Sequence, residues 1–267
     1  ILDSTINSDL VKCYPIKHSY QKAFLKWFMN KDNEIHDDIY AMYCNLISLS
    51  PEESTHYRHF SIDDGTLNII TVQESTNIIS DGTTGLCSWQ GAIGLSKWCS
   101  ENKSEISGKV ILELGCGIGL TGLSVISTCS PKQYIFSDCH KAVLSMACEN
   151  IKLNLIRSEP EVQAHLKLDT DVIIAADIIY EINSFHALAS GLKAFLSFEG
   201  RYAVIAATIR NIDTFNKFLT QNHFRLEWRL SFISVSSTSL SASFLGVFFD
   251  FFSFPFSFVF IFFVFEE

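Results

Sequence analysis

The chain has no surplus of basic residues, no closely spaced cysteine pair and no cluster of side chains at metal-ligand spacing. Lysine and arginine together number 20 against 29 acidic residues, and the formal net charge is −9. Because nucleic acids are bound through their phosphates by a basic face, this balance argues against a nucleic-acid partner. An acidic surface is compatible with a basic protein substrate, although most acidic proteins are merely soluble.

The eight cysteines are scattered and form no C-x-x-C pair. We therefore expect free thiols in a reducing, cytoplasmic compartment rather than a disulfide framework. These residues contain no secretory signal. Cys139 with His140, and His56 with His59, have no further partners at ligand spacing, so we expect no metal.

The most informative stretch is V-I-L-E-L-G-C-G-I-G-L-T-G at residues 110–122. The apolar run at 110–114, interrupted by Glu113, predicts a buried parallel strand. Gly115, Gly117 and Gly119 predict a sharp turn that a ligand can approach closely, and residues 120–128 predict a helix. This succession indicates a nucleotide-cofactor site; the alternative is a glycine-rich junction without a ligand.

The spacing of the glycines distinguishes between cofactors. A dinucleotide fingerprint, G-x-G-x-x-G/A, needs a small residue where this chain has Leu120. The pattern E-x-G-x-G-x-G places Glu113 beside the turn, where an acid suits a cationic amino-acid group. Asp138 lies 21 residues after Gly117, at the end of an expected strand at 133–137, and could accept hydrogen bonds from both ribose hydroxyls. The pattern resembles motif I of the class I S-adenosylmethionine methyltransferases.

The remaining periodicity predicts an α/β fold with a helical N-terminal appendage. Strands near 110, 134, 172 and 202 alternate with helices, which favours a mostly parallel, Rossmann-like sheet. Aromatic stripes predict two N-terminal helices, at 19–29 and 37–49, and alternation around Asp64 predicts a hairpin. The hairpin strands are expected at 57–62 and 67–73. We expect a helical domain at 1–56, a methyltransferase domain at 57–230 and a tail at 231–267.

Four tracts together resemble the eukaryotic elongation factor 2 lysine methyltransferase family. They are E-S-T-N-I-I-S-D-G-T-T-G-L-C-S-W, I-L-E-L-G-C-G-I-G-L-T-G-L, Y-I-F-S-D-C-H and D-V-I-I-A-A-D-I-I-Y. The resemblance covers residues from about 12 to about 228. It implies an S-adenosylmethionine-dependent enzyme that methylates a lysine of elongation factor 2. It also implies a cofactor site lined by Trp89, Gly115, Cys116, Gly117, Asp138 and Ala176. Composition alone favours a core position for Trp89, although a loop and aromatic before motif I can fold over a cofactor.

The resemblance places Asp177 and Tyr180, a D-x-x-Y motif, at the substrate lysine. The lysine must be neutral to attack, whereas its ordinary pKa is ~10.4. We expect Asp177 to hold the ammonium before deprotonation and Tyr180 to orient the amine. The alternative for Asp177 is a cap of the following helix.

Two departures from the family pattern affect the fold. Too few residues separate 162–168 from the strand at 172 to connect two parallel strands through a crossover. We therefore expect that a segment containing the family's usual third strand is omitted from this sequence. The family's L-D-W tract at the adenine has no counterpart. One alternative function is therefore a decayed, non-catalytic binding protein, and another is methylation of a different protein lysine.

The second departure is the tail, where residues 244–265 hold 12 of the 23 phenylalanines. Its length suits a membrane span, but Asp250 and Pro255 lie inside the run and basic flanks are missing. We interpret it as translated noncoding sequence in preference to a membrane anchor. We expect it to lie outside the fold and the family's terminal hairpin to be missing. The sequence leaves the oligomeric state open.

Overall fold

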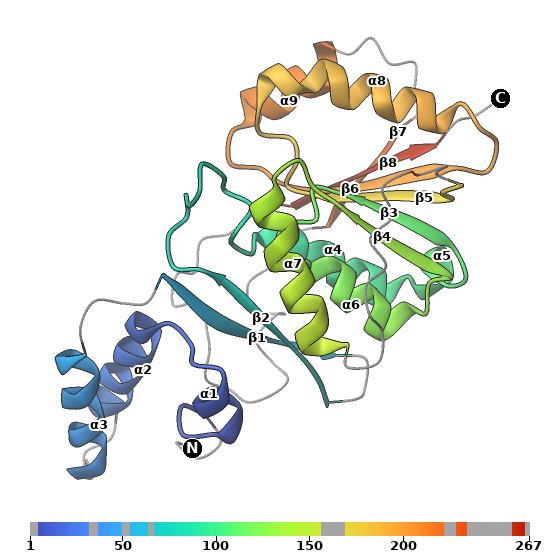
Figure 1. Ribbon diagram of the computed structural model, residues 1–267. Helices are drawn as coiled ribbons and strands as arrows, with labels where there is room; N and C mark the ends of the chain where they lie inside the picture. The colour runs from blue at the N-terminus through green and yellow to red at the C-terminus, as the bar shows by residue number, and fades with distance from the viewer. Residues whose placement is uncertain are drawn as a thin grey trace.

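The computed structural model describes residues 5–31, 37–49, 54–63, 67–155, 169–221, 228–233 and 258–264. Helices and a hairpin come first, and alternating strands and helices follow (Figure 1). In these ranges no helix combines the length and apolar character that crossing a bilayer requires. The helices are α1 Asp9–Cys13, α2 His18–Lys31, α3 Asp37–Ser48, α4 Gln90–Glu101, α5 Lys103–Ile106, α6 Leu120–Cys129, α7 Lys141–Asn154, the 3-10 helix η2 Ile182–Ser184, α8 Phe185–Leu196 and α9 Ile212–Gln221. The strands are β1 Thr55–Asp63, β2 Leu67–Ser75, β3 Val110–Leu114, β4 Gln133–Ser137, β5 Val172–Ala176, β6 Tyr202–Thr208, β7 Trp228–Ile233 and β8 Phe258–Val264.

A six-stranded sheet lies at the centre, in the order β4-β3-β5-β6-β8-β7. β4, β3, β5 and β6 run parallel, whereas β8 is antiparallel to both β6 and β7. Successive residues of a strand point to opposite faces. Ile111 therefore packs with α4 and α6, and Leu112 packs with α8 and α9 (Figure 1). These layers confirm the predicted α/β, Rossmann-like fold of the class I methyltransferases.

The predicted strands of the parallel sheet are confirmed. The expected ranges 110–114 and 133–137 coincide with β3 and β4, and the strands expected near 172 and 202 are β5 and β6. β3, β5 and β6 are short apolar runs that are largely buried, as expected for strands covered on both faces, whereas β4 is half-buried at the edge. Their carboxyl ends meet at one edge of the sheet, which is where open α/β sheets bind ligands.

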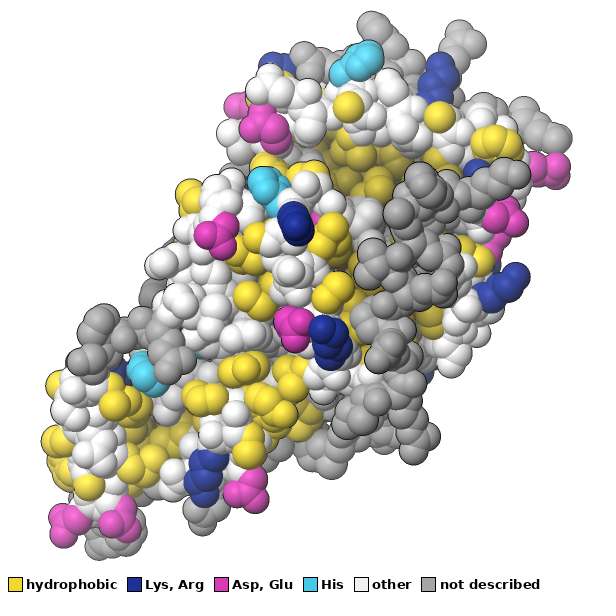
Figure 2. Space-filling model, viewed as in Figure 1, with side chains coloured by type: hydrophobic (Ala, Val, Ile, Leu, Met, Phe, Trp, Pro, Cys, Tyr) yellow, Lys and Arg dark blue, Asp and Glu magenta, His cyan; other side chains and the backbone are white. Residues whose placement is uncertain are grey.

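The N-terminal helices form a separate apolar cluster. Phe24 and Leu25 of α2 pack with Ile39 of α3. Tyr20 and Tyr40 remain exposed, and Figure 2 shows hydrophobic side chains gathered over this helical end of the molecule. The predicted helical appendage is therefore present, and its hydrophobic residues are divided between an internal cluster and the surface.

Helix α7 joins the hairpin to the sheet domain. β1 and β2 pair antiparallel, as predicted. The Thr71 and Gln73 N–H groups of β2 donate to Asn154 Oδ1 and Asn150 Oδ1, at 3.0 and 2.7 Å. The amide nitrogens of Asn154 and Asn150 donate in return to the Thr71 and Gln73 carbonyls, at 2.7 and 3.0 Å. Two asparagines thus hydrogen-bond β2 along its edge as a neighbouring strand would.

The end of the chain corrects two expectations. β8, from the phenylalanine-rich tail, pairs with β6 on one side and β7 on the other. The prediction that the terminal hairpin is missing is therefore wrong, as is the exclusion of residues 258–264 from the fold. Phenylalanine, valine and isoleucine favour strands, and β6 would otherwise expose an unpaired edge.

The expectation of an omitted third strand falls on residues 156–168, which lie outside the described residues. Within the described ranges, β4 is the edge strand on the side of β3, and β7 is the edge strand on the other side. The other domain boundaries, near residues 56 and 230, stay predictions.

Candidate active site

Residues 115–119, the glycine turn, connect β3 to α6. Gly115, Gly117 and Gly119 have φ angles of +67°, +52° and +89°. Other residues are strained in this region, so the turn requires glycine at these positions. Gly119 is the N-cap of α6. The backbone can therefore reverse sharply at the ligand edge of the sheet without side chains in the way.

Close packing of α6 on the sheet depends on Gly122, one turn into the helix. A Cβ atom there would collide with the rings of Phe136 and Tyr134. Leu120, at the position where dinucleotide folds need a small residue, is instead buried in an apolar cluster with Ile118. The small residue that brings helix and strand together is thus displaced by two positions from the dinucleotide pattern.

Asp138 lies beside the glycine turn, as predicted. Its Oδ2 accepts a hydrogen bond from Gly117 N at 3.3 Å, and its Oδ1 accepts one from His140 N at 3.0 Å. The Cys116 N–H donates to the Ser137 carbonyl at 2.8 Å, which ties the turn to the end of β4. A half-buried carboxylate with spare lone pairs at this edge can accept hydrogen bonds from a sugar diol.

Glu113 lies under the turn. Its side chain is 1% exposed and points toward the α4 and α6 layer, where Oε2 accepts a hydrogen bond from Tyr134 Oη at 2.7 Å. Burial raises its pKa to about 8, although the hydrogen bond from Tyr134 acts in the opposite direction. At neutral pH the group is therefore mostly an uncharged acid. The structure does not bring it to the open side of the turn, where a charge for a cationic ligand was expected.

Asp177 follows β5 with a φ angle of +53° and a side chain that is only 6% exposed. Its Oδ1 accepts a hydrogen bond from Thr208 N at 2.7 Å. Its Oδ2 accepts from Gly91 N at 2.8 Å, from Thr208 Oγ1 at 3.0 Å and from Arg210 Nη2 at 3.4 Å. The alternative that Asp177 caps the helix after it is wrong. The helical N–H group that donates to Asp177 is that of Gly91, in the first turn of α4.

Residues 76–89, here called the strap, run from β2 to α4 and lie against the glycine turn. The Gly85 carbonyl is 3.4 Å from the place that a Cβ on Gly117 would occupy. Trp89, half-buried at the end of the strap, donates its indole N–H to the Thr84 carbonyl at 3.0 Å. The guanidinium of Arg210 lies over its ring, 4.5 Å from the centroid. The strap thus places Trp89 beside Arg210, which also contacts Asp177.

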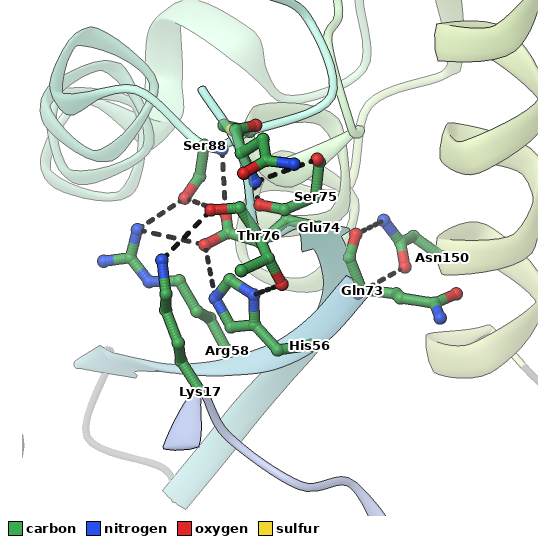
Figure 3. A network of polar contacts seen from close by, with 11 residues as sticks. Lys17, His56, Arg58, Gln73, Glu74, Ser75, Thr76, Ser88 and Asn150 are labelled. Atoms are coloured by element: carbon green, nitrogen blue, oxygen red, sulfur yellow. Dashed lines mark hydrogen bonds and ion pairs between the residues drawn. The ribbon is translucent and has the colours of Figure 1, made fainter. Parts of the chain in front are cut away.

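A buried carboxylate anchors the strap to the hairpin (Figure 3). Glu74 is 5% exposed, and its Oε2 accepts from Ser88 N at 2.8 Å and from Ser88 Oγ at 2.6 Å. His56 Nε2 and Arg58 Nη1 lie 3.1 and 3.7 Å from Oε1. Burial acts to raise the pKa of Glu74, but His56, Arg58 and Ser88 outweigh it and lower the pKa. Ser88, which precedes Trp89, is therefore held by a charged group.

The other predicted residues lie along the same edge. Ala176 is the last residue of β5 and pairs with Ala206 of β6. Tyr180 is 64% exposed beyond it. Cys116 is buried in the turn, and burial raises the pKa of its thiol, so it is not a reactive thiolate.

Four residues of this arrangement were not foreseen, namely Glu74, Gly91, Thr208 and Arg210. Gly91 is required by packing, since a Cβ there would lie 2.7 Å from the carboxyl carbon of Asp177. Thr208 ends β6 and Arg210 follows it by two residues. The rule that ligands bind at the carboxyl ends of parallel strands could have identified these two.

Comparisons with known proteins agree with this geometry. A family model described as lysine methyltransferase matches residues 68–223. The protein-lysine N-methyltransferase EEF2KMT of Bos taurus is 32% identical over 261 residues, covering 83% of this chain and 76% of the relative. Its Mus musculus counterpart is 33% identical over 248 residues, covering 83% and 73%.

A solved structure supports the fold. A candidate SAM-dependent methyltransferase of Streptococcus mutans superposes with a TM-score of 0.51 at 12% identity, covering 85% of this chain and 65% of that one. The chain therefore belongs to the lysine methyltransferase family, and it is an S-adenosylmethionine-dependent protein-lysine methyltransferase.

Proposed function

We propose that this enzyme methylates a lysine of elongation factor 2 in the cytoplasm. The support is the similarity to EEF2KMT proteins across 83% of the chain, together with the four sequence tracts described above. The acidic net charge of −9 is compatible with a basic protein surface as substrate.

We further propose that the cofactor binds in the glycine turn, with Asp138 at its ribose and Trp89 at its mouth. The observation that carries this assignment is the 3.3 Å contact between Asp138 Oδ2 and Gly117 N, which puts a sugar-binding carboxylate against a turn open to close approach. Gly115, Cys116, Gly119 and Ala176 complete the walls. Glu113 supports the turn from the buried side.

S-adenosylmethionine, when bound, supplies a sulfonium methyl group that passes to the lysine nitrogen as the carbon–sulfur bond breaks and its electron pair returns to sulfur. This displacement needs alignment more than acid–base help, and alignment is worth up to ~7–11 kcal/mol. We propose that the lysine enters at the corner formed by Asp177 and Tyr180. Tyr180 orients the amine, and the proton that the lysine ammonium loses before attack goes to water.

The test has two steps. Calorimetric titration with S-adenosylhomocysteine should show binding by the wild type. Asp138→Ala should weaken it about 10–100-fold, because two hydrogen bonds to a charged group are worth ~1.5–3 kcal/mol each before compensation. Asp169→Asn is the matched control, since that carboxylate is fully exposed before β5 and should leave the affinity unchanged.

Labelled cofactor is then incubated with the wild type and purified elongation factor 2. Label on a lysine of the factor is expected. Cofactor binding with label on another protein only would favour methylation of a different lysine. No binding at millimolar S-adenosylhomocysteine would favour a decayed binding module.

A further inference from the structure

Arg210 contacts two of the predicted site residues from a third strand end. It follows β6 by two residues, and its side chain is 44% exposed. Its Nη2 lies 3.4 Å from Asp177 Oδ2, and its guanidinium carbon lies 4.5 Å from the centre of the Trp89 ring. No motif in the sequence pointed to it, and its position at the sheet edge is set by the fold.

The carboxylate of Asp177 accepts four hydrogen bonds from the chain. Its Oδ2 accepts from the Gly91 N–H of α4, from the Thr208 hydroxyl at the end of β6 and from Arg210. Its Oδ1 accepts from the Thr208 N–H. Among the described residues, Arg210 is the charged side chain that contacts Asp177, and the contacts from α4 and β6 are uncharged. An incoming ammonium would therefore meet a neutralised carboxylate.

This arrangement suits the chemistry better than a free carboxylate would. The nucleophile is the neutral amine, and an unpaired carboxylate beside it would stabilise the ammonium and raise the amine's pKa. A neighbouring cation has the opposite effect, and arginine keeps its charge at every working pH. Compensation of Asp177 thus favours the reactive form of the substrate.

We propose that Arg210 is a positioning residue for methyl transfer: it neutralises Asp177, denies the substrate ammonium a free counter-charge, and so favours the lysine in its neutral form. The inference rests on the proposed function in one respect, the entry of the lysine at the Asp177–Tyr180 corner. Asp177 then organises the ends of β5, β6 and α4 instead of holding the ammonium.

The test is the pH dependence of kcat for methylation of elongation factor 2 at saturating cofactor and substrate, from pH 6 up to the alkaline plateau of kcat. The acidic limb of kcat reports the bound amine, whereas that of kcat/KM reports the free one. Arg210→Gln should move the kcat limb upward by about half to one pH unit, a ~3–10-fold loss on the limb with little loss on the plateau above it. Arg210→Lys keeps the cation and should leave the limb in place. Affinity for S-adenosylhomocysteine, measured on each variant, verifies the fold.

A uniform loss of kcat at all pH values would overturn the inference, because it would indicate packing alone. If Arg210→Gln fails to fold, Asp177→Asn replaces it in the same test, and the expected shift of the kcat limb is then in the opposite direction. It leaves Arg210 uncompensated and should move the limb downward, and an upward shift would refute the proposal. This result differs from a failure of the proposed function, in which the wild type itself would transfer no methyl group to elongation factor 2 at any pH.

Discussion

Replacing Glu113 with glutamine should make the stability of the protein much less dependent on pH. The carboxyl is 1% exposed, and its pKa rises from an ordinary 4.5 to about 8 on folding. Between these values the native state binds a proton that the unfolded state has lost. Stability from this group is therefore complete below pH 4.5 and declines as pH rises toward 8.

The magnitude follows from the shift of the pKa. A displacement from 4.5 to about 8 corresponds to a total loss of ~5 kcal/mol, at 1.36 kcal/mol per unit. Between pH 6 and pH 8 the expected decline is ~2 kcal/mol. Glutamine can still accept the hydrogen bond from Tyr134 and carries no charge at either pH. The variant should therefore gain ~2 kcal/mol on the wild type over this interval.

The assay is urea unfolding of both proteins at pH 6, 7 and 8, followed by circular dichroism. Subtracting the unfolding free energy of one protein from that of the other at each pH removes the contribution of the titrating groups that both proteins share. Parallel pH dependences would refute the reasoning, because they would mean that Glu113 is ionised in the native state.

Two further predictions concern the supports of the site. Gly91→Ala should destabilise the protein by ~1–3 kcal/mol, because its Cβ would lie 2.7 Å from the Asp177 carboxyl carbon, whereas Gly191→Ala on α8, where the space is open, should stabilise by ~0.5–1 kcal/mol. Equal effects in thermal denaturation would contradict the packing argument. Ser88→Ala should cost ~1–2 kcal/mol of unfolding free energy, because buried Glu74 loses a hydroxyl donor at 2.6 Å. Ser100→Ala, which removes only a bond to Lys97 O in the same helix, is the control and should be near neutral.

The sequence predicts the parallel sheet well because its strands are short apolar runs with distinct flanks. The local pattern of Val110 to Leu114 and of the glycines after it agrees with the overall fold. The strand and the turn could therefore be placed to the residue, and the helix to within one residue at its C-terminal end. The position of Asp138 could be predicted in the same way, because its spacing from the glycines along the chain places it at the end of the next strand, beside the turn.

The contacts of the site were harder to foresee. Whether Glu113 faces the ligand or the core depends on which side of β3 the helices cover, and periodicity does not decide this for a strand buried on both faces. The partners of Asp177 come from positions 91, 208 and 210, which only the folded sheet brings together. The tail was misjudged because its composition is atypical, while its pairing depends on the open edge of β6.

The two asparagines of α7 match the spacing of the hairpin residues that they contact, because one turn of a helix and two residues of a strand advance by nearly the same distance. One helical turn from Asn150 to Asn154 advances about 6 Å, and the two strand residues from Thr71 to Gln73 advance about 6.6 Å. A side-chain ladder at this spacing fixes the hairpin in one register, since a slip by a single residue would break every rung. The hairpin and α7 should therefore open as one cooperative unit, and their amide protons should exchange with solvent at a common rate.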